Sequence, residues 1–312
     1  HGRVDVVGQK PARMLAQITL DPFLGKEIAE VSEADERSLL VHYQAPLVAG
    51  DDVYVQTKGG TFFPCDPPGS GEPAPCGVDA WSSVVWREEG WRWNGAALER
   101  TWLFSSDWKP PPNGAAVNGW EPVFHAALAG PYILVPAAGG AIWALDRSSG
   151  SAVKKLDPFD GEAADRTFVA GPLTVGANGD VYYHALRLAP LPPKTGAAGE
   201  PDTAWDLDIE GAWLVHLEPD GTPHKASFDD LVLGAPDPHA QCQGSFKKAD
   251  LPWPPSPDAT PAAVLCGSQR PGLNVAPAVA DDGTLFTVSR AHYAGRASFM
   301  VAVNPDLTPK WT

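Results

Sequence analysis

Basic residues are scarce in this sequence of 312 residues, which has 23 Lys and Arg against 38 Asp and Glu, a formal net charge of −15. Proteins that bind nucleic acid or anionic membrane surfaces need a basic patch. The composition therefore argues against both kinds of partner. No apolar run is long enough to cross a membrane as a helix, so we predict no transmembrane segment.

The sequence also lacks the short motifs that mark common catalytic and cofactor sites. It has no Gly-x-Ser-x-Gly elbow and no His-Glu-x-x-His. It has no P-loop and no Gly-x-Gly-x-x-Gly, and no c-type haem motif. No enzyme class that depends on one of these motifs is supported by this sequence.

Only four cysteines are present, and none is adjacent to another. No Cys-x-x-Cys or Cys-x-x-His spacing occurs, which argues against a zinc site. Four cysteines allow three pairings. The simplest joins Cys65 to Cys76 and Cys242 to Cys266, closing a Pro-rich loop in each case. Disulfides of this kind indicate an oxidising compartment, so we predict a periplasmic, cell-surface or secreted protein.

Glycine (31) and proline (33) are abundant, as expected of many short strands joined by turns. One pattern, an apolar strand followed by a Gly- or Asp-containing turn and a second strand, recurs in residues 43–55, 125–135, 169–183 and 275–288. A second pattern, an apolar strand followed by an acidic or Asn residue and a turn, recurs in residues 141–153, 212–224 and 299–311, with a further copy in residues 17–28. Such repeats predict antiparallel meanders.

Residues 139–150, GGAIWALDRSSG, are the most distinctive copy of the second pattern. With the Pro-apolar opening strands, they resemble the PQQ-like (quinoprotein-type) β-propeller repeat family. The resemblance implies an all-β fold, a β-propeller of four-stranded antiparallel blades. An antiparallel sandwich with chance self-similarity is the alternative. Quinone-dependent dehydrogenases of the family have adjacent cysteines and carboxylates around Ca²⁺. Because no adjacent cysteine pair exists here, PQQ is not expected, and the resemblance points to a non-dehydrogenase branch.

We predict a single propeller domain over residues 1–312 with an N-terminal arm at residues 1–10. Its blades are expected at residues 39–108, 120–159, 166–233 and 273–312, with disulfide-stapled insertions at residues 60–80 and 234–271. Four or five repeats are few, because rings of this family usually have seven or eight blades. Trp311 is expected to end a third strand, which leaves the last blade without its fourth. The N-terminal copy could supply that strand, the chain could be part of a larger ring, or two chains could associate to complete one ring.

Alignment of the repeats on their opening Pro or Ala indicates which residues line the central channel. It places four residues at one level of the channel, Gln44, His125, Ala170 and Val275. Imidazole groups can ligate a metal or act as acid and base near neutral pH. At the far end of the next strand the alignment places His184, with Arg290 one residue further in the last copy and His292 close by. The candidate catalytic residues at the channel or its loops are therefore His125, His184, Arg290 and His292. The alternative is that each histidine only caps a strand end by hydrogen bonding.

The candidate binding residues are Gln44, Lys58, Trp91 and Trp93. Trp91 and Trp93 alternate along a strand and so share a face, either as a platform for a carbohydrate or partner or as a seam between blades. Most of the 12 tryptophans are expected to wedge between blades.

The leading functional hypothesis is an exported, non-catalytic propeller that acts as a binding or assembly scaffold for protein partners. The first alternative is a metal-dependent hydrolase or lyase, lactonase- or phosphotriesterase-like, with Ca²⁺ at the channel mouth. The acidic residues 157–165 offer oxygen ligands but lack EF-hand spacing. The second alternative is carbohydrate binding. No cofactor follows from the sequence itself.

Overall fold

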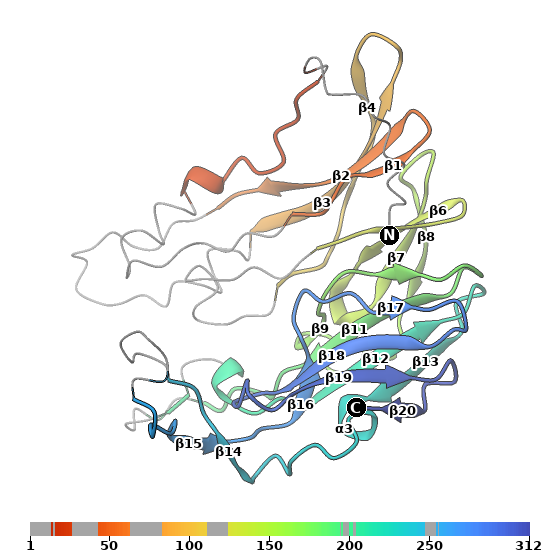
Figure 1. Cartoon of the computed structure of the whole chain (residues 1–312). Helices are drawn as coiled ribbons and strands as arrows, with labels where there is room; N and C mark the ends of the chain where they lie inside the picture. Colours follow the sequence, from red (N-terminus) through yellow and green to blue (C-terminus); the bar gives the residue numbers. More distant parts are fainter. Residues whose placement is uncertain are drawn as a thin grey trace, which may run out of the picture.

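The computed structural model describes residues 14, 16–26, 43–62, 83–110, 124–193, 195, 200–201, 204–246, 254 and 256–312. Within these ranges, four antiparallel sheets of four or five strands follow one another along the chain (Figure 1). Each sheet is a meander, in which the strand order follows the chain, except that the first two strands of the third and fourth sheets both pair with the next strand. Successive four-stranded meanders are the blades of a β-propeller fold, so the predicted fold class is confirmed.

The strands of the four sheets are short. The first sheet contains β1 (Leu47–Ala49), β2 (Asp52–Gly60), β3 (Val84–Trp93) and β4 (Leu98–Ser105). The second contains β5 (Ala127–Ala129), β6 (Tyr132–Pro136), β7 (Ile142–Asp146) and β8 (Ala152–Leu156). The third contains β9 (Thr167–Val169), β10 (Thr174–Val175), β11 (Val181–Arg187), β12 (Gly211–Leu217) and β13 (Pro223–Ser227). The fourth contains β16 (Gln269–Pro271), β17 (Ala278–Val279), β18 (Leu285–Ala291), β19 (Ser298–Val303) and β20 (Pro309–Trp311).

The third and fourth sheets share a further feature, an innermost strand that is split into two pieces. β9 and β10 pair with opposite ends of β11, and β16 and β17 pair with opposite ends of β18. Further described elements are the pair β14 (Gln241–Gln243) and β15 (Ala263–Leu265), the helix α3 (Phe228–Leu231), and the 3-10 turns η2 (Ala138–Gly140) and η3 (Ala204–Asp206).

The hairpin turns that open the four sheets follow the chemistry expected from the repeat. Each contains a glycine with positive φ, at Gly50 (66°), Gly130 (56°), Gly179 (92°) and Gly283 (80°). Glycine adopts this conformation at little cost because it has no Cβ. The tight turns bring consecutive strands into antiparallel register.

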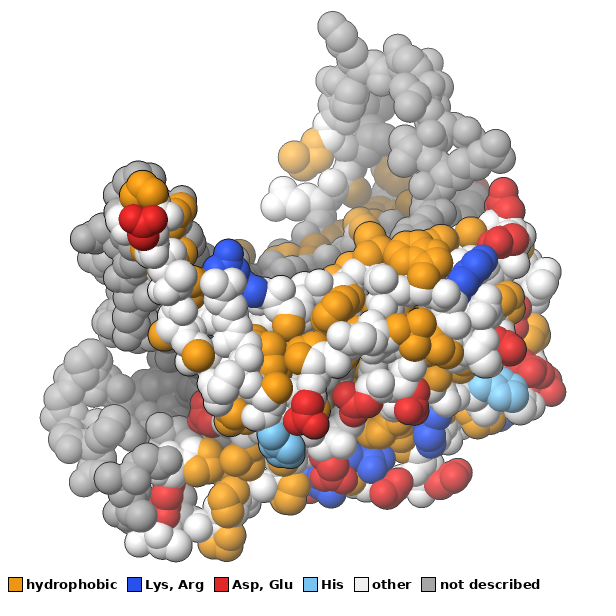
Figure 2. Space-filling model, turned by 60° about the horizontal axis from the view of Figure 1, so that its bottom comes forward, with side chains coloured by type: hydrophobic (Ala, Val, Ile, Leu, Met, Phe, Trp, Pro, Cys, Tyr) orange, Lys and Arg blue, Asp and Glu red, His pale blue; other side chains and the backbone are white. Residues whose placement is uncertain are grey.

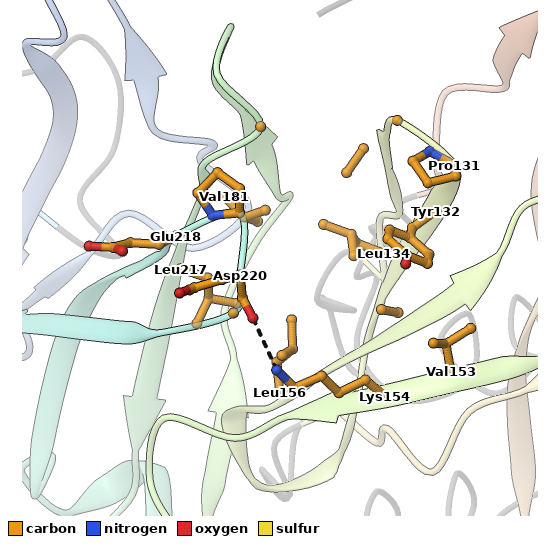
Figure 3. A pocket seen from close by; sticks show the side chains of 16 residues that line it. Pro131, Tyr132, Leu134, Val153, Lys154, Leu156, Val181, Leu217, Glu218 and Asp220 are labelled. Atoms are coloured by element: carbon orange, nitrogen blue, oxygen red, sulfur yellow. Dashed lines mark hydrogen bonds between the residues drawn. The ribbon is translucent and has the colours of Figure 1, made fainter.

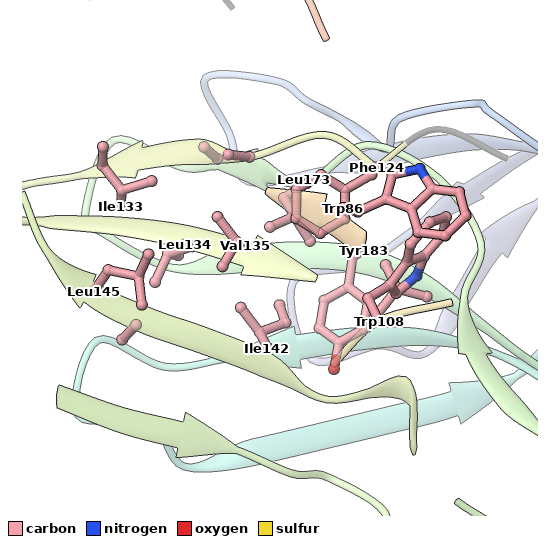
Figure 4. Packing of buried hydrophobic residues seen from close by; sticks show 14 of the residues in the cluster. Trp86, Trp108, Phe124, Ile133, Leu134, Val135, Ile142, Leu145, Leu173 and Tyr183 are labelled. Atoms are coloured by element: carbon pink, nitrogen blue, oxygen red, sulfur yellow. The ribbon is translucent and has the colours of Figure 1, made fainter. Parts of the chain in front are cut away.

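Apolar packing between adjacent sheets forms the core. One buried cluster draws on the first three sheets (Figure 4), and a second joins the third sheet to the fourth. In the first cluster, the Trp86 and Trp108 rings meet edge to face at 5.2 Å, and the Trp108 ring lies 5.4 Å from that of Phe124. Trp102 of the first sheet is also buried and donates from Nε1 to the carbonyl of Arg147 in the second. The expected wedging of tryptophans between blades is confirmed for these three residues.

The prediction that the last blade lacks a fourth strand is wrong. β20 pairs with β19 and completes the fourth sheet. The chain reverses in a five-residue turn in which the Asn304 amide donates to the Thr308 carbonyl at 2.8 Å. The N-terminal copy lies elsewhere, because the Lys58 amide of β2 donates to the carbonyl of Leu20. That segment therefore runs beside the first sheet rather than completing the fourth.

The predicted disulfide between Cys242 and Cys266 is confirmed, with the two Cα atoms 5.0 Å apart. It lies beside the β14–β15 pair, in which Cys242 is the register partner of Val264. Cys65 and Cys76 lie outside the described residues.

The contact between Trp102 and Gly150 gives a test of the packing between the first two sheets. A Cβ added to Gly150 would lie 2.5 Å from the Trp102 ring, and Gly150 has a φ of 69°. Gly50 has a similar φ but nothing within 4 Å of an added Cβ. Both alanine variants therefore carry backbone strain, and only Gly150→Ala adds overpacking of about 1–3 kcal/mol. We expect urea denaturation to show a lower free energy of unfolding for Gly150→Ala than for Gly50→Ala. Equal values would contradict this packing.

Candidate functional site

Gln44, a predicted channel residue, joins the first sheet to the second. Its Nε2 donates to Glu88 Oε1 at 2.9 Å, and its Oε1 accepts from the Ala126 amide at 2.8 Å. Its own amide donates to Gln56 Oε1 at 3.0 Å. Gln44 is buried. Its side chain is therefore hydrogen-bonded within the protein at both polar atoms, and it connects the first sheet to the start of the second.

Glu88 is the most isolated acidic group of this network. Its side chain is fully buried, and Oε2 has no hydrogen-bond partner in the described part of the chain. Burial raises the pKa of Glu88 to about 8, against the hydrogen bond from Gln44 and together with the charge of Glu89. Glu88 is therefore mostly neutral at pH 7.

Lys58 forms a buried ion pair. Its Nζ lies 2.8 Å from Asp21 Oδ2, and the two side chains are 1% and 3% exposed. Asp21 also accepts from the Tyr43 hydroxyl at 3.0 Å and the Phe23 amide at 2.8 Å. Removal of one member of a buried ion pair typically costs several kcal/mol. Through its ion pair with Asp21, Lys58 holds the N-terminal segment against β2.

Trp91 and Trp93 lie on one face of β3, as their spacing predicts, and both are half-buried. Trp91 donates from Nε1 to Glu89 Oε2 at 3.1 Å. The Glu89 carboxylate also accepts from Thr57 Oγ1 at 3.0 Å. The two indoles thus combine packing with partial exposure.

His184 connects the third sheet to the fourth. It is fully buried, with Nδ1 3.0 Å from the Val275 carbonyl and Nε2 2.9 Å from Thr287 Oγ1. Since a carbonyl only accepts, Nδ1 carries the proton and Nε2 accepts from the hydroxyl. Burial lowers the pKa of His184 to about 4, against the hydrogen bond to Val275. The imidazole is neutral at pH 7, and both nitrogens are engaged.

His125 is half-buried at the start of the second sheet and donates from Nδ1 to the Ala126 carbonyl at 2.9 Å. Burial lowers its pKa. Its sheet differs from those that hold the other candidate catalytic residues. His184, Arg290 and His292 all belong to the interface of the third and fourth sheets or to the fourth sheet itself.

Arg290 and His292 come together at the end of β18, with a third residue that the sequence did not indicate. Arg270 of β16 donates from Nε to His292 Nδ1 at 3.2 Å. His292 in turn donates from Nε2 to the Trp205 carbonyl at 3.0 Å. The guanidinium of Arg270 lies 5.0 Å from the Trp205 ring centroid. Arg270 was missed because it falls in residues 234–271, where we expected a long insertion.

A cavity of about 330 Å³ lies between the second and third sheets (Figure 3). Its wall is mainly apolar and includes Tyr132, Leu134, Leu156, Val181 and Leu217. Lys154 Nζ donates to the Asp220 carbonyl at 3.2 Å, from one sheet to the other. The sequence did not indicate this cavity, because its wall combines hairpin turns from two different repeats.

Among the described residues, no group of three or more His, Cys, Asp or Glu side chains is arranged to hold a metal ion. No described helix is both long and apolar enough to cross a membrane.

No protein family matches this chain, and no curated protein sequence matches it. Solved structures resemble it at low identity. A europium-containing methanol dehydrogenase is 11% identical with a TM-score of 0.42, over 88% of this chain and 42% of that one. BamB from Moraxella catarrhalis is 15% identical with a TM-score of 0.28, over 82% and 71%. A luciferin-regenerating enzyme is 9% identical with a TM-score of 0.31, over 91% and 76%. The chain spans about two fifths of the dehydrogenase.

The raised pKa of Glu88 predicts a pH dependence of stability. Below the pKa of the unfolded state, near 4.5, Glu88 is protonated in both the folded and the unfolded protein. Its contribution to the free energy of unfolding is then at its maximum. It is lost as the pH rises to about 8, because the folded protein holds a proton that the unfolded chain releases. We expect Glu88→Gln to remove a slope of about 1 kcal/mol per pH unit over this window.

The measurement is the free energy of unfolding by urea at several pH values between the two pKa values. Exposed Glu99, which accepts from Asn94 Nδ2, provides the control variant Glu99→Gln. Parallel pH profiles for wild type and Glu88→Gln would show that the buried carboxyl does not titrate as described.

Proposed function

We propose that this chain is an exported, non-catalytic β-propeller that serves as a binding scaffold for a protein partner. The apolar cavity between the second and third sheets receives side chains of that partner. The observation that carries the proposal is a contrast between two regions. The polar side chains of Gln44 and His184 are hydrogen-bonded within the protein. The wall of the cavity, in contrast, is mainly apolar and open to a partner.

The internal bonds of the histidines count against the hydrolase alternative. A metal at His184 would displace the hydrogen bond to Val275 or Thr287. Acid–base catalysis near pH 7 needs a pKa near that value, and burial lowers the pKa of His184 to about 4. His184 therefore suits a structural role between blades.

The size and wall of the cavity support binding of a few apolar side chains. At about 330 Å³ it lies at the lower end of the range for ligand pockets. Tyr132 and Val153 contribute exposed apolar surface at its edge, being 39% and 56% exposed. Aromatic and aliphatic groups in a partly enclosed pocket are typical anchors of protein interfaces. The described surface in Figure 2 also shows hydrophobic and acidic side chains interspersed.

The disulfide between Cys242 and Cys266 supports the exported location, because disulfides persist in oxidising compartments. The excess of acidic residues suits a scaffold whose partner is a protein rather than a nucleic acid.

The proposal is tested by selecting peptides from a random displayed library on the purified chain. We expect the selected peptides to be rich in apolar residues, and Val153→Asp to weaken their binding by about 10-fold or more, because the change places a charge at an apolar wall. The control is Val48→Asp, since Val48 is 63% exposed in the first sheet, away from the cavity wall.

Affinities are measured by fluorescence anisotropy with labelled selected peptides. If both aspartate variants bind equally well, the cavity is not the binding site. If no peptide is enriched over an unrelated protein of similar charge, the scaffold proposal fails.

A further inference from the structure

Two arginine side chains lie directly opposite each other in the fourth sheet. Arg270 of β16 and Arg290 of β18 are register partners, and Ser298 of β19 is the partner of Arg290 on its other side. Side chains of directly opposite residues project from the same face of an antiparallel sheet. Like charges at such positions are destabilising, so this pair needs a physical reason.

The third sheet shows what the repeat places at the same two positions. The opening hairpins of the third and fourth sheets close with equivalent backbone hydrogen bonds. This equivalence matches the Phe168–Leu186 register pair to Arg270–Arg290. Phe168 and Leu186 are both buried. The repeat thus accepts an apolar pair, and strand pairing alone does not require the arginines.

Neither guanidinium forms an ion pair in the part of the chain that the structure describes. Arg270 donates from Nε to His292 and from Nη1 to the Pro271 carbonyl at 3.3 Å. Arg290 donates only from Nε, to the Ala291 carbonyl at 3.4 Å. Nη2 of Arg270 and both terminal nitrogens of Arg290 thus have no bond to a described residue. These three donors remain available to a ligand.

Both arginines keep their charge in an unfavourable setting. Burial and then the charge of Arg290 lower the pKa of Arg270 to about 9, and burial lowers the pKa of Arg290. Each is protonated at pH 7. Asp208 carries a nearby negative charge that acts on His292, but its carboxylate accepts from the amide and hydroxyl of Ser268 at 2.9 Å.

We propose that Arg270 and Arg290 form a binding site for a small oxyanion, a carboxylate or a phosphate, that bridges the two guanidinium groups. Planar guanidinium forks match both anions through paired hydrogen bonds. The site opens to solvent beside Ser298 and Gly295, which are exposed. Gly295 allows the Arg290 guanidinium to lie against its backbone, because a Cβ at residue 295 would be only 2.8 Å from Arg290 Nη2.

His292 and Trp205 act as positioning residues. His292 accepts from Arg270 and donates to Trp205, so its tautomer is set by both bonds. Burial lowers the pKa of His292, which keeps a third positive charge out of the cluster. The ring of Trp205 covers Arg270 on one side. This site lies apart from the cavity between the second and third sheets, and its test does not depend on the scaffold proposal.

The test is calorimetric titration and thermal unfolding of the whole chain with inorganic phosphate and with malonate, at constant ionic strength set with sodium chloride. We expect a rise in Tm with phosphate, malonate or both, because a ligand that binds only the folded state stabilises it. Arg290→Gln should weaken binding by about 10- to 100-fold. Arg92→Gln, at an exposed arginine paired with Asp52, should respond as wild type does.

A second variant, Arg270→Phe with Arg290→Leu, installs the apolar pair of the third sheet. It should lose the anion response and be at least as stable as wild type in anion-free buffer, because uncompensated charges are replaced by packing groups. A response to phosphate alone assigns the site to phosphate groups, and a response to malonate alone assigns it to carboxylates. The proposal is overturned if wild type responds to neither anion beyond chloride, or if Arg290→Gln responds as wild type does. If the double variant does not fold, the result for Arg290→Gln alone decides the test.

Discussion

The burial of apolar side chains between adjacent sheets is the interaction on which the rest of this structure depends. A single four-stranded meander exposes two faces and cannot bury an adequate core by itself. Trp86 and Trp108 are almost fully buried because the first three sheets contribute to one cluster. The second cluster extends the same arrangement to the fourth sheet. Each blade thus owes its stability to its neighbours.

Burial of the sheet faces also determines how the inner polar groups behave. A buried polar group without a partner costs free energy, so the inner positions form bonds across the blades. Gln44 bonds to Ala126 across the first boundary, and His184 bonds to Val275 and Thr287 across the last. The side chains of Gln44 and His184, two of the residues predicted from the sequence to bind or react, are therefore engaged in joining blades. Glu88, with one unpartnered oxygen, is an exception in this network.

The repeat made the overall fold predictable, because strand and turn patterns are local. The meanders, the positive-φ glycines of the opening turns and the Cys242–Cys266 disulfide all follow from short-range patterns. β20 was missed because three residues after a proline-containing turn carry little periodic signal. The cavity and the Arg270–Arg290 pair could not be predicted, because each depends on which residues of separate segments become neighbours.

The buried positive charges of this protein differ in whether a negative group of the chain pairs with them. Lys58 is paired with Asp21 at 2.8 Å. Arg187 Nη1 of the third sheet lies 3.1 Å from Glu162 Oε1, and the Arg187 guanidinium lies 5.1 Å from the ring centroid of Trp213. Each of these charges has a partner that offsets the loss of hydration. Arg270 stacks on Trp205 but, like Arg290, it forms no ion pair with a described residue, although the repeat accepts an apolar pair at the same positions. A buried pair of like charges without a counter-charge in the described part of the chain is best explained by an anionic ligand from outside the chain.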